Sequence, residues 1–193
     1  MAKLTLVLAS KSPRRQALIA ELGIPFEVRI KEVEENYPTD LDPRKVPEFL
    51  AQLKAKPLRA TLADHEVLLT SDTVVISNNQ VLGKPGNAKE AKNMLHSLSG
   101  KTHEVITGVS LLSVREEVLF SNCTKVTFAE LDEREIDYYI TQFKPFDKAG
   151  SYGIQEWIGY IGVQKIEGCY YNVMGLPLHE VYRTLKQRFN LEF

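Results

Sequence analysis

The sequence is poor in cysteine, with only Cys123 and Cys169 in 193 residues. The two lie too far apart for a C-x-x-C redox pair and match no zinc-ligand spacing, so we expect free thiols in a reducing compartment, with a single disulfide as the alternative. No apolar run approaches the roughly 18 residues that span a bilayer, and the N-terminal apolar run is too short for a signal peptide. These absences predict a cytoplasmic protein that does not enter a membrane.

An excess of charge of either sign is also absent. The 24 basic and 25 acidic side chains leave a formal net charge of −1, so no overall field attracts nucleic acid or an anionic membrane. Any anion-binding site must therefore be local. With 44% hydrophobic and 25% charged residues, the chain is typical of a globular protein, and its length fits one domain over residues 1–193.

Several common nucleotide and metal motifs are missing as well. The pair Gly83-Lys84 lacks the earlier glycine of a G-x-x-x-x-G-K-[ST] loop and is followed by proline, and no G-x-G-x-x-G occurs. The four histidines show no H-x-x-x-H spacing, which argues against a zinc hydrolase. Any phosphate chemistry must therefore use another arrangement.

What is present is an interleaved pattern of strands and helices. Apolar runs and capping residues predict strands at 4–9, 26–30, 66–77, 103–114 and 118–131, and helices at 13–22, 44–62, 88–98, 133–142 and 177–188. Residues 78–80 (NNQ) are expected to form a turn, and residues 160–175 a hairpin that turns at Glu167-Gly168. Because the order lacks strict β-α-β regularity, the pattern favours an α/β fold with a mixed, twisted sheet and flanking helices.

Arg14 and Arg15 stand in the first turn of the helix that Ser12-Pro13 begins. A cation there is disfavoured by the helix dipole by a few tenths to about 1 kcal/mol, and a bound anion reverses that sign. The free N–H groups of the helix end and two arginines together predict a phosphate site. The alternative is that both arginines pair with surface carboxylates.

Asp72 interrupts the strongly apolar strand VLLTSDTVVI. A carboxylate in such a strand is unfavourable unless it is paired, bound to metal or placed at an open strand end, so Asp72 is a candidate base or metal ligand. The alternative is that it caps a turn with Thr73. The loop pair Glu34 and Glu35 would complete an oxygen-rich Mg²⁺ site beside Asp72, or is merely solvated.

Lys54 and Lys84 are the remaining candidates that the residues suggest. Lys84 stands in LGKPG, where a turn between glycine and proline fixes the direction of the ammonium group. Both are candidate phosphate contacts, and the alternative for each is an ordinary solvent-facing lysine.

Eight segments, in order, resemble the Maf family of nucleoside-triphosphate pyrophosphatases over about residues 4–185. They are LASKSPRRQALIAELGIPFEV, EVEE, LAQLKAK, SDTVV, LGKP, LHSLSGKTHEVITGVSL, DKAGSYGIQ and GCYYNVMGLPLHEVY. The resemblance implies a fold similar to inosine-triphosphate pyrophosphatases, with two lobes around a cleft. It also implies hydrolysis of a nucleoside triphosphate to its monophosphate and pyrophosphate, helped by Mg²⁺ or Mn²⁺.

The resemblance also assigns roles to residues. Asp72 takes the role of the catalytic base, with Glu34, Lys54 and Lys84 as further catalytic positions and with Glu34 and Asp72 as metal ligands. The nucleotide would be bound by five residues: Ser10, Arg14, Arg15, Thr73 and Gln155.

Within the family, Arg14, Thr73 and Gln155 match the branch that acts on dTTP and UTP. The alternatives are the 7-methyl-GTP branch and a nucleotide-binding regulator of septum formation. Thr70-Ser71 before the aspartate, and Trp157 after the glutamine, depart from the usual family pattern. The sequence does not decide the oligomeric state and leaves a homodimer open.

Overall fold

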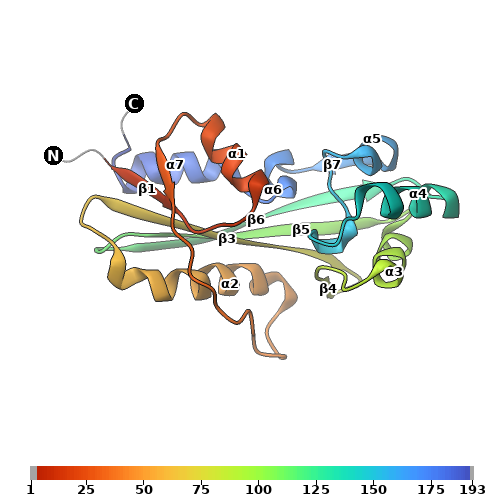
Figure 1. Cartoon of the computed structure of the whole chain (residues 1–193), viewed down its shortest axis with the longest axis horizontal. Helices are drawn as coiled ribbons and strands as arrows, with labels where there is room; N and C mark the ends of the chain where they lie inside the picture. The colour runs from red at the N-terminus through yellow and green to blue at the C-terminus, as the bar shows by residue number, and fades with distance from the viewer. Residues whose placement is uncertain (1–3, 192–193) are drawn as a thin grey trace. The chain divides into compact units, whose positions relative to one another are not determined.

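The computed structural model describes residues 4–191, and within them the protein is an α/β fold built on a seven-stranded mixed sheet (Figure 1). The strand order is β2-β1-β3-β5-β6-β7, and β4 pairs with β3. The strands are β1 (Thr5–Leu8), β2 (Phe26–Val28), β3 (Glu66–Ser77), β4 (Gln80–Leu82), β5 (Thr102–Leu112), β6 (Glu117–Phe128) and β7 (Val163–Glu167). The helices are α1 (Pro13–Glu21), α2 (Val46–Ala55), α3 (Ala88–Leu98), α4 (Glu133–Phe143), α5 (Trp157–Gly162), α6 (Tyr170–Met174) and α7 (Leu178–Arg188). The predicted fold class is confirmed.

The chain forms two compact units. The first consists of the chain up to Asp72, residues 107–122 and the chain from Gly175 onward, and the second of residues 73–106 and 123–174. The boundaries fall inside β3, β5 and β6, so each of these strands contributes to both units.

The first unit contains a switch in strand order at β1. β1 pairs in parallel with β2 on one side, where Leu6 lies opposite Phe26, and with β3 on the other, where Leu8 lies opposite Leu69. The chain passes from β1 through α1 to β2 and then crosses to the opposite side of β1. In open α/β sheets, ligands bind beyond the carboxyl ends of the strands at such a switch. The topology therefore directs attention to the residues that follow β1 and to Asp72 in β3.

Helix α2 covers the strands of the first unit on the side opposite to α1 and α7 (Figure 1). Ala55 and Leu58 pack there against three strand residues: Val7, Leu68 and Leu112. A helix over 44–62 was expected, but the α-helix ends at Ala55 and continues as a 3₁₀ turn over Lys56–Thr61. Pro57 explains the change, because proline lacks an N–H and crowds the preceding turn.

The second unit confirms several local predictions. Asn87 caps α3 by accepting the N–H of Glu90 at 3.0 Å, and Asp132 and Glu135 cap α4 reciprocally. Asn78 and Asn79 have positive φ angles in the tight turn between β3 and β4, as expected for a two-residue hairpin turn.

The hairpin predicted over residues 160–175 is wrong. Only Val163–Glu167 forms a strand, β7, and it pairs antiparallel with β6. The residues before it belong to α5, and Tyr170–Met174 form α6. The partner of β7 is thus a strand distant in sequence, which hydrophobic alternation alone does not reveal.

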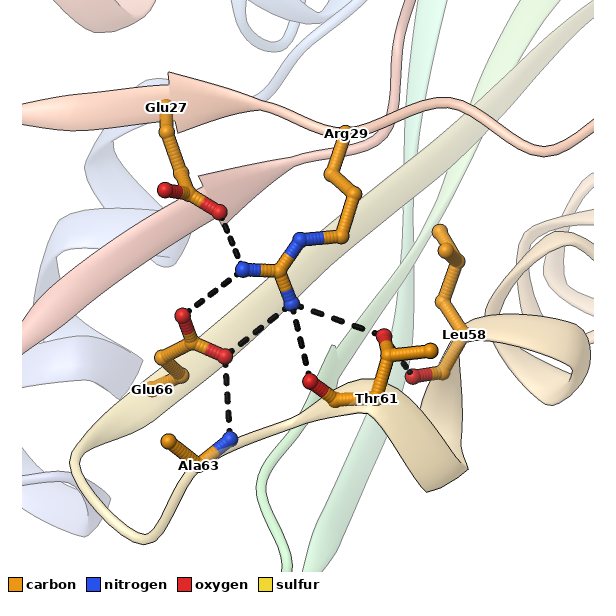
Figure 2. Close-up of polar contacts among 6 residues, drawn as sticks. All are labelled: Glu27, Arg29, Leu58, Thr61, Ala63 and Glu66. Atoms are coloured by element: carbon orange, nitrogen blue, oxygen red, sulfur yellow. Dashed lines mark hydrogen bonds and ion pairs between the residues drawn. The ribbon is translucent and has the colours of Figure 1, made fainter.

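An ion-pair cluster ties β2 to the start of β3 within the first unit (Figure 2). Arg29 binds Glu66 through two bonds, of 2.7 and 3.0 Å, and also contacts Glu27 and the carbonyl of Thr61. The Glu66 carboxylate also accepts the N–H of Ala63 at 3.0 Å. Glu66 is only 8% exposed. The hydrogen bonds from Arg29 lower the pKa of Glu66 although burial opposes the shift.

We expect Glu66→Gln to lower the free energy of unfolding by about 1–3 kcal/mol at pH 7, because it removes a charge-assisted bidentate pair. Since the folded-state pKa of Glu66 is lowered, its contribution is present above the ordinary glutamate pKa and disappears as the pH falls through the folded-state value. Urea denaturation at several pH values measures this. The control is Glu27→Gln, a more exposed partner of the same arginine, and a pH-independent difference would contradict the assignment.

Candidate functional site

The turn between β1 and α1 is built around two serines. Ser12 is the N-cap of α1, and its hydroxyl accepts the N–H of Arg15 at 3.4 Å, while Pro13 occupies the first helical position. Ser10 is buried, its hydroxyl accepts the N–H of Ser12 at 3.2 Å, and its carbonyl accepts from Gln16 at 3.0 Å. The turn is therefore fixed by its own hydrogen bonds at the switch point of the sheet.

Arg15 connects this turn to two other segments of the first unit. Its Nε donates to the carbonyl of Gly175 at 2.8 Å, and its Nη1 donates to the carbonyl of Ser71 at 2.9 Å. Burial lowers the pKa of Arg15, and the nearby Asp72 carboxylate opposes that shift. Two nitrogen atoms of the guanidinium group, Nε and Nη1, thus hold the backbone at Gly175 and at Ser71, the residue before Asp72.

Lys54 joins two carboxylates. Its Nζ lies 2.5 Å from Oδ1 of Asp72 and 3.1 Å from Oε1 of Glu35. The side chains of Lys54 and Asp72 are only 18% and 13% exposed, whereas that of Glu35 is 50% exposed. In a little-exposed pair of this kind, each charged group compensates for the water that the other has lost.

Lys54 lies in the last turn of α2, and a hydrogen bond from β3 holds this helix in place. The hydroxyl of Thr70, in β3, donates to the carbonyl of Ala51 at 2.7 Å, one turn before Lys54. Thr70 precedes Asp72 by two residues, so this bond fixes the helix against the strand where the pair forms. The departure from the usual family pattern at Thr70 therefore has a local structural role.

Glu34 and Glu35 differ in their surroundings. Glu35 contacts Lys54, whereas Glu34 is exposed and accepts a hydrogen bond from the side chain of Asn36 at 3.3 Å. The acidic pair was visible in the sequence, but the member that reaches Lys54 depends on how the loop folds.

The carboxylates suit a hard divalent cation better than a soft one. Among residues 4–191, no three histidine, cysteine, aspartate or glutamate side chains form a metal-binding group. Carboxylate oxygens are nevertheless the ligands that Mg²⁺ prefers, and the ion is usually held by one or two carboxylates with its remaining positions filled by water and phosphate oxygens. The carboxylate oxygens of Asp72 and Glu35 are therefore of the kind that fits Mg²⁺ or Mn²⁺.

The second unit carries the other predicted residues. Thr73 directly follows Asp72 in β3, and Lys84 is exposed in the loop after β4. The carbonyl of Gly83 accepts the N–H of Gly150 at 3.0 Å, which anchors that loop. Gln155 is half-buried in the turn before α5. The turn around Gln155 is held by Tyr139, Lys148 and Glu156, which the sequence motifs did not single out.

Comparison with known proteins gives the family. Residues 5–188 match the Maf-like protein family. The chain belongs to this family, which confirms the resemblance seen in the sequence.

Named relatives match over almost the full length of the chain. The dTTP/UTP pyrophosphatase of Porphyromonas gingivalis is 51% identical over 187 residues, which cover 95% of this chain and 94% of that protein. The dTTP/UTP pyrophosphatase of Phocaeicola vulgatus is 52% identical over 186 residues, with 96% of each chain covered. Among solved structures, the Staphylococcus aureus Ham1 protein matches with a TM-score of 0.49 and 14% identity, over 93% of this chain and 98% of that one.

A helix long and apolar enough to cross a membrane does not occur between residues 4 and 191.

Proposed function

We propose that this protein hydrolyses nucleoside triphosphates, with a preference for dTTP and UTP, to the monophosphate and pyrophosphate. The observation that carries the proposal is the little-exposed Lys54–Asp72 pair, which lies beyond the switch point of the sheet in a member of the Maf-like family. The names of the relatives that are about half identical supply the substrate. We also propose that the protein works in the cytoplasm, where nucleotide pools are found.

Asp72 acts as the general base in this proposal. Its carboxylate takes a proton from a water molecule, the water oxygen bonds to the α-phosphorus, and the bond from that phosphorus to the bridging oxygen of pyrophosphate breaks. Lys54 holds the carboxylate in place through Oδ1, which leaves Oδ2 for the water. General base catalysis requires such a fixed geometry within hydrogen-bond reach of the water.

The negative charge of the triphosphate is balanced by cations and backbone donors. The free N–H groups of α1 and the side chain of Arg14 are assigned to the phosphates. Arg15 contributes to phosphate binding in two ways. Its hydrogen bonds hold the carbonyls of Ser71 and Gly175 in place, and its positive charge attracts the phosphates. Lys84 is assigned to the phosphates as well, from its position in the family motif.

Glu34 and Asp72 are the residues we assign to a divalent metal, Mg²⁺ or Mn²⁺, from their positions in the family motifs, although Glu35 and not Glu34 contacts Lys54. The bound metal would spread the charge that develops on the phosphate oxygens. The protein's own contribution is to supply the oxygen donors and to keep Lys54 and Asp72 oriented.

The proposal is tested by measuring pyrophosphate release from dTTP, UTP, CTP and 7-methyl-GTP, with and without Mg²⁺. We expect kcat/KM for dTTP and UTP to exceed that for the other two by about tenfold or more. Highest activity with 7-methyl-GTP would show that the protein belongs to the methylated-purine branch instead. Binding of all four without pyrophosphate release would favour a nucleotide-binding regulator instead.

Gln155 is assigned to the base of the nucleotide, together with Thr73. Gln155→Ala should reduce the ratio of kcat/KM for dTTP to that for GTP by about tenfold, because it removes a hydrogen bond to the base. A tenfold change corresponds to about 1.4 kcal/mol. Gln164→Ala, an exposed glutamine of β7, is the matched control. An unaltered dTTP-to-GTP ratio in Gln155→Ala would remove the residue from base recognition.

A further inference from the structure

The turn Gly153–Glu156 of the second unit is held on both flanks. Inside the turn, the N–H of Glu156 donates to the carbonyl of Gly153 at 3.0 Å. On the N-terminal flank, the hydroxyl of Tyr152 lies 2.7 Å from Nε2 of His103, and the Tyr152 ring packs edge-on against Phe128. Burial lowers the pKa of His103 to about 4, so this contact involves a neutral imidazole at working pH.

On the C-terminal flank, Glu156 uses its side chain in an unusual way. It is the N-cap residue of α5, yet its side chain makes no capping hydrogen bond. The side chain instead folds back over Gly153, where a Cβ would come within 2.8 Å of Cδ of Glu156. Its Oε2 accepts from the hydroxyl of Tyr139, and its Oε1 lies 3.0 Å from Nζ of Lys148.

Tyr139 and Lys148 give the Glu156 carboxylate a fixed position. Tyr139 is fully buried in α4, and its hydroxyl also accepts the N–H of Gly153 at 3.0 Å. Burial raises the pKa of Tyr139, so the hydroxyl remains a donor to Glu156. Lys148 is 8% exposed, and a cation so little hydrated requires partners, which Asp147 and Glu156 provide.

Gln155, between these two flanks, has little to hold its own carboxamide. Its backbone carbonyl accepts from the hydroxyl of Tyr160 at 2.9 Å. Its side-chain oxygen, in contrast, is covered and has no hydrogen-bond partner among residues 4–191. The direction of the carboxamide therefore depends on the turn that carries it and on packing, and not on a hydrogen bond to its oxygen.

We propose that Glu156 is a positioning residue for base selection, because it clamps the turn and so fixes which side of the Gln155 carboxamide a pyrimidine meets. The proposal rests on the proposed function, in which Gln155 contacts the base. Its substrate class is pyrimidine nucleoside triphosphates with a carbonyl at C4, as in thymine and uracil.

The selectivity follows from the donors and acceptors of the two partners. A carboxamide has an acceptor oxygen and a donor NH₂ group. With its oxygen covered, the Gln155 carboxamide offers a base only its Nε2 hydrogens, which suit O4 of thymine or uracil. Cytosine has the N4 amino donor at that position, so two donors would face each other. A carboxamide freed to rotate by half a turn would accept cytosine instead.

Two variants test the clamp. Glu156→Ala removes the carboxylate, and Tyr139→Phe removes only the hydroxyl that joins Glu156 to Gly153. In each, we expect the ratio of kcat/KM for dTTP to that for dCTP to fall by about tenfold, while kcat for dTTP stays within about twofold of that of the unmodified protein. A structural defect alone would lower kcat/KM for both substrates by the same factor and leave their ratio unchanged.

The matched control is Glu167→Ala, which removes an exposed glutamate paired with Lys165 in the same unit, and its ratio should not change. Circular dichroism establishes that each variant is folded, and Tyr139→Phe decides the question if Glu156→Ala does not fold. A folded Tyr139→Phe with an unchanged dTTP-to-dCTP ratio would overturn the proposal.

Gln155→Ala in the same assay separates this proposal from the proposed function. If Gln155→Ala lowers the ratio and the two clamp variants do not, the positioning role of Glu156 is wrong while base reading by Gln155 stands. If Gln155→Ala leaves the ratio unchanged, base reading itself is wrong, and the positioning role is overturned with it.

Discussion

Asp72→Asn should reduce kcat for pyrophosphate release from dTTP by about 10²–10⁴-fold, the usual contribution of a general base. Asparagine has nearly the same shape as aspartate but cannot take a proton from water. It also removes the negative charge that Lys54 contacts at 2.5 Å. Steady-state measurement at saturating dTTP and Mg²⁺ gives the comparison directly.

The control for this variant is Asp64→Asn, which changes an exposed aspartate shortly before β3 in the same unit. Its kcat should be unchanged. A folded Asp72→Asn protein with kcat within about twofold of the original would exclude Asp72 as the base, since such a loss is far below what general base catalysis supplies.

Local signals in the sequence predicted much of the fold. Asn87 and Asp132 act as caps because their side chains satisfy N–H groups only a few residues away, and Asn78-Asn79 turns because asparagine tolerates positive φ. Strand β3 could likewise be predicted from its own residues, because its apolar composition accounts for its burial. Features set by neighbours in sequence can be recognised without the structure.

The errors and omissions arose from distant partners. β7 pairs with β6 and not with residues 170–174, and the hydrogen bond from Arg15 to Gly175 spans 160 residues. Neither contact leaves a mark in the local pattern of hydrophobic and polar residues. The contact between Tyr139 and Glu156 likewise joins α4 to the turn before α5, so the clamp around Gln155 could be recognised only in the folded protein.

The candidate site shows the same division. Asp72 was found because an acidic residue in an apolar strand is anomalous wherever it occurs, and its pairing with Lys54 supplies the compensation that burial requires. The choice between Glu34 and Glu35 as the residue beside Lys54 depended on the path of an irregular loop, which sequence patterns describe poorly.

Gly108→Ala should be strongly destabilising, by about 2–4 kcal/mol in the free energy of unfolding. Gly108 is buried in β5, and a Cβ built there would lie 2.3 Å from the backbone nitrogen of Glu48 and from the carbonyl carbon of Pro47. Both atoms belong to the backbone at the start of α2, so no side chain can rotate to make room. Urea denaturation measures the loss.

The same substitution should also impair catalysis, because α2 must move to admit the methyl group and α2 carries Lys54. We expect the folded fraction of Gly108→Ala at low temperature to hydrolyse dTTP with a lower kcat, since Lys54 no longer meets Asp72 correctly. Gly83→Ala is the control for stability: the position has open space around a Cβ and an ordinary φ, so its change should stay within about 0.5 kcal/mol. Equal stability of Gly108→Ala and Gly83→Ala would show that α2 yields easily, and the Lys54–Asp72 geometry would then not depend on the close approach of α2 to β5.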